Sequence, residues 1–595
     1  MVKKSQGAFG LIEIILAVGI FGLVAGSGVL TVLHSFNLNR LGEQETQAAN
    51  FANQGLEAVR SIRKVGWSNL VNGTYGLSSS GGSWAFSGSS DTNGKMTRTV
   101  VIADGNRDGN GNIVDVGTVD PDLKKVTSTV TWSFGPTRND SVVTTEYFTN
   151  FAKAIANAGD GLLTYSNASL LPKWKSYGNT VNTFGSVTDM PSGAVARNWA
   201  SAVSPTKNEM TAVYTDNAGN LRVMCFNGST WSQDFSVTVG GAGTTRRFDV
   251  AYETGSGDAM VVYSTNVGTT NELAYITKVG ANDCGSANWS AATNLDPVRT
   301  TGIVHWVKIA EDDRVGSNLL AMVWADANSD LSAMIWSGSA WTNEPTAVTE
   351  ASLEVVTIAQ DVEDFDIEYE SLSGDIMLVW ANSAGSNAVN GVRYRVCTGG
   401  TSACTWGAVT TPPTFLDDAT NLDLAADPSS DAMVFASIGN AGSDLQNGYW
   451  SGSAWTNVAN ADTSCGTPTA GSKKVAVGWL NSGATKRSLV VYNDSAATGI
   501  DWRTGSAGTF TAQTDWVPTP VMNATKGYIE LIADPKNLDR LSLVVVDGAS
   551  DLFTKRVVMT SVPAFTWTNS DGGVAHDVAL PSFVANPFSF NYWRN

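Results

Sequence analysis

The sequence contains little of what most enzymes depend on. Only three histidines occur among 595 residues, and they lie far apart, at positions 34, 305 and 576. This spacing argues against a multi-histidine metal site and against a histidine-based catalytic triad. The G-x-S-x-G, H-E-x-x-H and C-x-x-C motifs are missing too. Most enzyme classes are therefore poor matches for this chain.

Charge is scarce, and what there is of it is mostly negative. Charged residues make up 15% of the chain, against about 25% in ordinary soluble domains. The 37 lysines and arginines face 55 aspartates and glutamates, which gives a formal net charge of −18. Because proteins neutralise nucleic-acid phosphates with lysine and arginine, we expect no nucleic-acid partner.

Glycine, by contrast, is abundant. It accounts for 59 residues, which is near 10% of the chain against a usual share of about 7%. Such a composition is typical of many short strands joined by tight turns. The length also exceeds the ~100 to 200 residues of one domain. We expect a mainly β protein of two or more folding units.

One long apolar run begins near the N-terminus. Between Leu11 and Leu33 the only ionisable side chain is Glu13, and the run is as long as the ~20 residues that a helix needs to cross a membrane. Lys3 and Lys4 precede it, which predicts a cytoplasmic N-terminus and export of the rest of the chain.

The helical pattern continues beyond this run. Apolar residues recur at three- and four-residue spacing as far as position 62, with no proline. We expect one helix over residues 9–65, of which 9–34 lie in the membrane and the remainder is amphipathic.

The string KKSQGA followed by FGLIEIILAVGIFGLV resembles the leader and N-terminal helix of type IV pilins and pseudopilins. The resemblance implies a prepilin leader over 1–8, cleavage between Ala8 and Phe9, and N-methylation of Phe9. It also implies that Glu13 pairs with the N-terminal amine of a neighbouring subunit during assembly. Ala8 stands where the family usually has glycine, so cleavage after Gly7 stays an alternative.

The same resemblance implies partners and a location. The partners are other pilin subunits, the prepilin peptidase and the pilus assembly machinery. The chain would sit in the inner membrane before assembly and in an extracellular filament or on the cell surface afterwards.

Residues 66–153 carry period-2 segments typical of an antiparallel sheet. We expect strands near 96–103, 113–117, 126–134 and 141–151, packed on the amphipathic half of the helix. Such an α+β unit is similar to a pilin head.

One segment of this head has the spacing of a calcium loop. Asp104, Asn106, Asp108 and Asp115 place oxygen ligands at the intervals of such a loop, with aspartate at the position usually held by glutamate. The alternative is a solvated hairpin in which these residues and Gly109 serve turn geometry.

After a linker at 154–160, the segment 161–595 is repetitive. Two columns of residues recur about every 55 residues. One column ends an apolar strand, and its members are Tyr165, Tyr214, Tyr263, Trp324, Trp380, Phe435, Tyr492 and Val546. The other closes a hairpin, and its members are Phe184, Trp231, Trp289, Trp341, Trp406, Trp455, Phe510 and Trp567.

A unit of this length with four short strands is typical of a β-propeller blade. The first copy lacks its lead strand, and the C-terminal segment PFSFNYWRN is a spare strand that could complete it and close the ring. We expect eight blades, with seven as the alternative. Two residues beyond each apolar strand stand turn formers, which we interpret as backbone chemistry.

The cysteines fit an exported location. Cys397 and Cys404 lie close enough in one hairpin to form a disulfide. Cys225, Cys284 and Cys465 leave one thiol over, and their pairing stays open.

The sequence favours a binding protein over an enzyme. Adjacent acids such as Asp312/Asp313, Glu363/Asp364 and Asp417/Asp418 are interpreted as solvated loops. We expect a minor pilin-like subunit that displays the propeller for adhesion, with an extracellular glycan or protein ligand, and no cofactor apart from the calcium of the head loop. The alternatives are a tethered glycan-acting hydrolase and a pseudopilin of a type II secretion system.

Overall fold

The computed structural model describes residues 10–594, except 66, 81–82, 109–111, 136–137, 150–159, 193, 241–244, 348, 350–362, 383–390, 413–418, 440–443, 467, 470, 495–498, 519–520, 524, 561–563 and 581–585. It divides into two compact units, Met1–Lys153 and Ala154–Asn595. The fold is mainly β, with one long N-terminal helix and an eight-bladed propeller.

The helix α1 spans Leu11–Val65, with Glu13 in its first turn and Arg63 and Lys64 in its last. These charges oppose the helix dipole at both ends and favour helix formation. Between Leu11 and Leu38 its large apolar side chains are exposed. This half is long and apolar enough to cross a membrane, which makes it a candidate membrane anchor or signal sequence.

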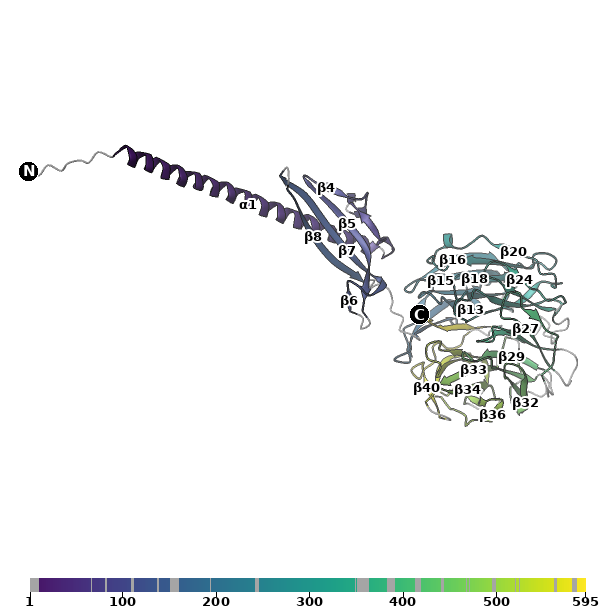
Figure 1. The fold of residues 1–595 in the computed structure, drawn as a ribbon. Coiled ribbons are helices and arrows are strands. Elements are labelled where there is room, and N and C mark those ends of the chain that lie inside the picture. Colours follow the sequence, from purple (N-terminus) through teal and green to yellow (C-terminus); the bar gives the residue numbers. More distant parts are fainter. Residues whose placement is uncertain are drawn as a thin grey trace, which may run out of the picture. The chain divides into compact units, whose positions relative to one another are not determined.

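The other half of α1 packs on a six-stranded antiparallel sheet, as Figure 1 shows within the first unit. The strands follow the order β1-β5-β7-β8, and β4 and β6 also pair with β5. Small helix residues such as Ala52 and Val59 are fully buried against inward-facing Val126 and Val130. The bounds are η1 Trp67–Asn69, β1 Gly73–Tyr75, β2 Leu77–Ser80, β3 Ser83–Phe86, β4 Asp91–Asn93, β5 Met96–Arg107, β6 Ile113–Val114, β7 Thr118–Gly135 and β8 Arg138–Thr149.

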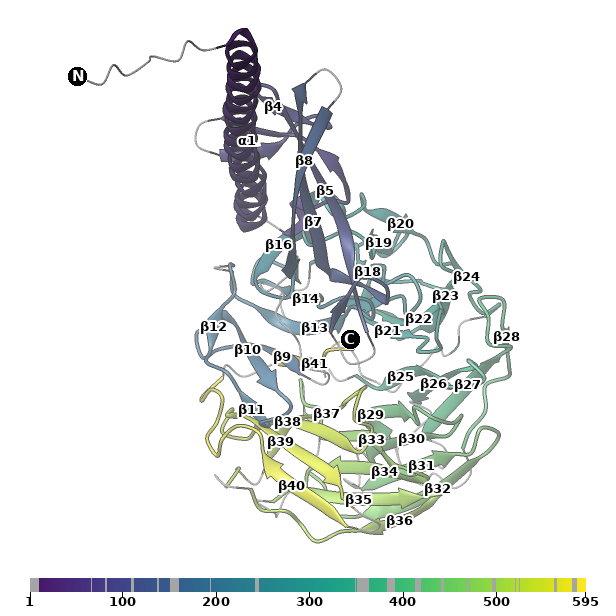
Figure 2. The same ribbon diagram turned by 60° about the vertical axis from the view of Figure 1, so that its left-hand side comes forward.

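The second unit is a ring of eight antiparallel sheets, which follow one another around the ring in Figure 2. Blade 1 contains β9 Gly161–Ser166, β10 Pro172–Gly178, β11 Thr183–Phe184, β12 Thr188–Asp189 and β41 Phe588–Tyr592. Blade 2 contains β13 Arg197–Val203, β14 Met210–Thr215, β15 Asn220–Phe226 and β16 Trp231–Thr238. Blade 3 contains β17 Phe248–Tyr252, β18 Ala259–Ser264, β19 Leu273–Lys278 and β20 Thr293–Leu295, with η2 Ser286–Asn288 before β20. Blade 4 contains β21 Val304–Glu311, β22 Leu320–Asp326, β23 Leu331–Trp336 and β24 Trp341–Thr342.

The remaining four blades repeat the same order from the innermost strand outwards. Blade 5 contains β25 Phe365–Tyr369, β26 Ile376–Ala381, β27 Val392–Thr398 and β28 Thr405–Trp406. Blade 6 contains β29 Ala419–Ala426, β30 Met433–Gly439, β31 Leu445–Trp450 and β32 Trp455–Asp462. Blade 7 contains β33 Val475–Ser482, β34 Thr485–Tyr492, β35 Asp501–Ser506 and β36 Thr509–Ala512. Blade 8 contains β37 Lys526–Ala533, β38 Arg540–Asp547, β39 Leu552–Met559 and β40 Phe565–Asn569.

The two residue columns found in the sequence fall at equivalent places in the blades. The apolar column lies on the second strand of every blade, where both sheet faces are buried against neighbouring blades. The hairpin column opens or lies within the fourth strand, except at Trp289. There η2 and the disulfide of Cys284 lengthen the hairpin, so β20 starts only at Thr293.

The C-terminal strand closes the ring. Strand β41 pairs with β9 along its whole length, from Phe588 opposite Tyr165 to Tyr592 opposite Gly161. The prediction of a completed first blade is confirmed, and the alternative of seven blades is excluded. No edge of the first sheet is left open on this side.

The turn formers after the second strands serve the backbone, as expected. Asp216 accepts hydrogen bonds from the N–H groups of Ala218 and Asn220, both at 2.9 Å. Asp326 and Asp547 make the same pattern in blades 4 and 8. These side chains fix the turns that lead into the third strands.

Two disulfides cross-link the propeller. The predicted bond between Cys397 and Cys404 is present, and Cys225 bonds to Cys284, while the buried Cys465 is free. The bond between Cys225 and Cys284 joins blade 2 to the hairpin of blade 3. This pairing could not be assigned from the sequence.

The two disulfides should contribute unequally to stability. Cys225 and Cys284 are 59 residues apart, and Cys397 and Cys404 are 7 apart. Loop-closure entropy then predicts losses of about 4 and about 2 kcal/mol in the free energy of unfolding when each pair is replaced by serine. Denaturant unfolding of the two double variants measures this order. A larger loss for the 397/404 pair would contradict it.

Candidate functional site

The innermost strands of the ring surround a channel, and their amino-terminal ends form one mouth of it. A narrow cavity at this mouth collects side chains from four blades and from the loop before β41. Its lining residues are Trp306, Glu363, Gly471, Ser472, Lys473, Tyr528 and Asn586. Each lies at or just before the start of an innermost strand, so the cavity exists only when the ring is closed.

Ion pairs run between blades at this mouth. Arg246, which precedes β17 in blade 3, binds Glu363 of blade 5 at 2.9 Å. Their side chains are 8% and 16% exposed, so little water screens the pair. Lys473 binds Asp423 of the preceding blade at 2.7 Å.

Deeper in the channel, carboxylates join each blade to the next. Asp249 accepts the N–H of Ile309 at 2.9 Å, and Asp366 accepts the N–H of Leu424 at 3.0 Å. Lys308 binds Asp366 at 2.5 Å. The channel charges therefore hold the ring together as well as facing its lumen.

At the opposite end of the channel, Arg594 extends beyond β41 and binds two acids of blade 4. Its guanidinium donates to Asp313 at 2.9 Å and to Glu311. The two ends of the channel are thus both bridged by arginine.

Burial and nearby cations shift the pKa values of the channel acids in opposite directions, and the balance differs from one acid to the next. Desolvation alone would raise the pKa of Glu363, but Arg246, Lys308 and Lys473 together outweigh it and lower that pKa. Burial raises the pKa of Glu530, because the nearby cations offset only part of the desolvation. Burial also raises the pKa of Glu368 well above its usual value, and Asp366 adds to this shift.

The surplus of buried acids predicts a pH dependence of stability. Burial likewise raises the pKa values of Asp249, Glu311 and Asp366. An acid with a raised folded pKa binds its proton more tightly in the native ring than in the unfolded chain, so its contribution is lost as pH rises through that pKa. Taken alone, these acids favour a higher melting temperature of the propeller at pH 5 than at pH 8. The buried His305 and His576 act in the opposite direction, because burial lowers their pKa values to about 4 and about 3 and both are neutral in the fold.

The variant Glu368→Gln tests this explanation, because glutamine resembles the protonated acid. It should melt above the wild type at pH 8, and this difference in melting temperature should shrink at pH 5. Exposed Glu43→Gln serves as the control and should change neither property. A difference between Glu368→Gln and the wild type that does not shrink from pH 8 to pH 5 would contradict the assignment.

The residues predicted for leader cleavage, Ala8 and Phe9, lie outside the described residues. Glu13 is described, in the first turn of α1. Its carboxylate accepts the backbone N–H of Gly10 at 3.0 Å and is exposed to the surroundings of the helix. This position leaves the carboxylate available to an outside partner.

The predicted calcium ligands of the head each contact other groups of the chain. Asp104 binds Lys124 at 2.5 Å, and Asp115 binds Lys125 at 2.6 Å. Asn106 donates to the backbone of Asp115, and Asp108 accepts the N–H of Asn112. The spacing of a loop is present, but strand pairing between β5 and β7 places lysines beside the acids, and each ligand is used within the hairpin.

Sequence reasoning missed the channel acids. Glu363 and Asp364 were expected in a solvated loop, but Asp364 is 1% exposed and Glu363 lines the mouth. Asp312 is also buried, and Arg314 and Ser317 bind it. Asp417 and Asp418 lie outside the described residues. One signal in the sequence could have found these residues. Acids and bases recur just before or at the start of the first strand of each repeat, as Arg246, Glu363 and Lys473 do.

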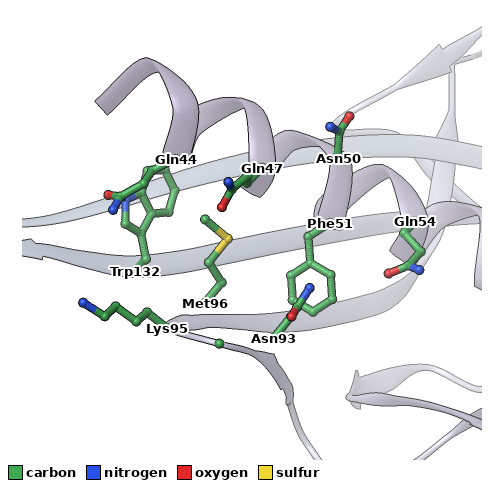
Figure 3. Close-up of a pocket in the computed structure, with 10 residues that line it drawn as sticks. Gln44, Gln47, Asn50, Phe51, Gln54, Asn93, Lys95, Met96 and Trp132 are labelled. Carbon is green, nitrogen blue, oxygen red and sulfur yellow. The ribbon is translucent and has the colours of Figure 1, made fainter. Parts of the chain in front are cut away.

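The head contains a separate open groove of about 510 Å³ between α1 and the turn from β4 to β5 (Figure 3). Its floor is Phe51, Met96 and Trp132, and its rim consists of amides with Lys95 as the one charge. Trp132 donates its indole N–H to Gln44 at 3.1 Å. Amide groups both donate and accept hydrogen bonds, so the groove suits neutral polar groups.

No protein-family model matches the chain, and a search of curated proteins returns no match. Solved structures with similar folds include BP39L lectin from Burkholderia pseudomallei, at 14% identity and a TM-score of 0.45, over 64% of this chain and 99% of that one. Aleuria aurantia lectin, a six-bladed propeller, matches at 10% identity and a TM-score of 0.29, over 54% and 95%. Saccharomyces cerevisiae Sqt1 matches at 10% and 0.39, over 66% and 87%. At these values the comparison carries no argument about what the chain binds.

Proposed function

We propose that the chain is a minor pilin-like filament subunit that displays its propeller outside the cell for ligand binding. The observation that carries the proposal is α1. Its first half exposes apolar side chains together with Glu13, and its second half packs on an antiparallel head sheet. A helix exposed in this way requires lipid or neighbouring helices, and the carboxylate requires a cationic partner.

The ligand is proposed to bind at the channel mouth. The cavity there is lined by Trp306 and Tyr528, which are 6% and 5% exposed, and by the polar groups of Ser472, Lys473 and Asn586. Flat apolar faces beside hydrogen-bonding groups suit the two faces and the hydroxyl groups of a sugar. A glycan on a cell surface is therefore the ligand class that we propose, and a protein ligand remains the alternative outcome.

Two measurements on the full chain in detergent test the proposal. Mass analysis of the protein from cells that process prepilins should show loss of the first eight residues and a methyl group on Phe9. Glycan arrays should show binding that Lys473→Gln weakens at least tenfold, while the control Lys536→Gln, an exposed lysine in the turn after β37, leaves it unchanged. An unprocessed N-terminus would refute the filament role, and arrays without binding would refute the glycan ligand.

One observation favours a second candidate, a tethered glycan-acting hydrolase. Glu363 and Glu530 face the same channel with pKa values shifted in opposite directions, which is the relation that a general acid and base require. Turnover of chromogenic glycosides that is lost in Glu530→Gln would favour this candidate. Binding without turnover favours the adhesin.

A further inference from the structure

Two carboxyl groups meet at the rim of blade 3. Glu272 lies immediately before β19, and Asp296 follows β20, so strand pairing brings them together. The carboxyl group of Asp296 lies within hydrogen-bonding range of that of Glu272. Glu272 is 2% exposed, and its Oε2 has no hydrogen-bond partner in the described part of the chain. A buried oxygen of this kind requires an explanation.

The neighbouring acids do not explain why Oε2 of Glu272 has no partner in the described part of the chain. Asp326 of blade 4 accepts four backbone N–H groups, from residues 301, 302, 328 and 330. Asp330 accepts the hydroxyl of Thr301 at 2.6 Å. Burial raises the pKa of Glu272, and Asp296 and Asp326 raise it further. No lysine or arginine is among the described groups that act on it.

Blade 7 provides a contrast at the corresponding place. Asp501 begins β35, and Asp515 follows β36. Burial and Asp515 raise the pKa of Asp501 to about 7, but Lys526 lies close enough to oppose the shift. The acid pair of blade 7 therefore has a cation from the chain itself, and the pair of blade 3 does not.

Two carboxyl groups in contact must share either a proton or a cation. We propose that Glu272 and Asp296 bind a calcium ion that fixes the outer edge of blade 3 near Asp326 of blade 4. Calcium accepts oxygen ligands in flexible geometry, whereas magnesium demands a near-ideal octahedron. The expected dissociation constant is about 0.1 to 1 mM, as in extracellular calcium modules. This site is independent of the ligand proposed for the channel mouth.

The test is calorimetric titration of the full chain in detergent, stripped with EDTA, with calcium chloride and then magnesium chloride. We expect one calcium site, at least tenfold weaker magnesium binding, and a higher melting temperature of the propeller with calcium. Glu272→Gln should weaken calcium binding at least tenfold. The matched control Asp501→Asn, a buried rim acid beside a lysine, should leave it unchanged.

Circular dichroism shows whether Glu272→Gln folds. If it does not, Asp296→Asn replaces it, because Asp296 is the more exposed partner, and this variant should also weaken calcium binding at least tenfold. Absence of calcium heat in the wild type would overturn the proposal and leave a shared proton as the explanation. Calcium binding that survives both substitutions, or that Asp501→Asn removes, would overturn it as well.

Discussion

Deletion of residues 587–595 is expected to unfold the propeller as a whole and not only its first blade. The deletion removes β41, whose five residues pair with β9 and complete the innermost position of blade 1. It also removes four aromatic side chains that are 5% exposed or less, namely Phe588, Phe590, Tyr592 and Trp593. Loss of one such side chain from a core costs about 3 to 5 kcal/mol. For four side chains the total is about 12 to 20 kcal/mol, which matches or exceeds the roughly 5 to 15 kcal/mol by which a typical domain is stable.

The point variant Phe590→Ala measures one part of this effect. Its ring contacts those of Tyr177 and Tyr592, so we expect a loss of about 3 to 5 kcal/mol in the free energy of unfolding. Val181→Ala is the matched control, because Val181 belongs to the same blade and is 68% exposed. It should change stability by less than about 0.5 kcal/mol. A truncated chain that melts like the wild type would show that the ring does not depend on its closing strand.

The blade count could be predicted because two independent residue columns repeat with one period. The apolar column marks a second strand with both faces buried, and the aromatic column marks the end of a hairpin. Burial and turn geometry act locally, so they leave a signal in the sequence. The spare C-terminal strand was visible for the same reason, since Phe588, Phe590 and Tyr592 alternate with polar residues.

The channel charges could not be predicted in this way. Arg246 and Glu363 are 117 residues apart and meet only because blades 3 and 5 face one lumen. In the sequence, Glu363 beside Asp364 resembles any solvated acidic pair. The ion pair of Asp104 with Lys124 could not be predicted for a related reason, because the register of β5 with β7 sets which lysine lies beside Asp104. Pairs of charges depend on topology, which spacing along the chain does not encode.

Replacement of Glu13 by leucine is expected to abolish incorporation into filaments while leaving membrane insertion intact. Glu13 is the only ionisable residue in the apolar stretch of α1, and its side chain is exposed in the described part of the chain. Leucine inserts into lipid more readily than glutamate, so the monomer should reach the membrane at least as well. The proposed pairing with a neighbouring N-terminal amine would be lost, and an unpaired charge within the bilayer costs about 2.5 to 3.5 kcal/mol.

That cost corresponds to roughly a 100-fold change in an assembly equilibrium, at 1.4 kcal/mol for each factor of ten. The amount of chain in sheared filaments, relative to the amount in membranes, measures it by immunoblot. Glu45→Gln is the matched control, since Glu45 is exposed on the same helix beyond the apolar stretch, and it should assemble normally. A defect confined to the filament fraction would identify the carboxylate as an assembly group. Equal amounts of Glu13→Leu and wild type in filaments would instead mean that α1 packs through its apolar surface alone.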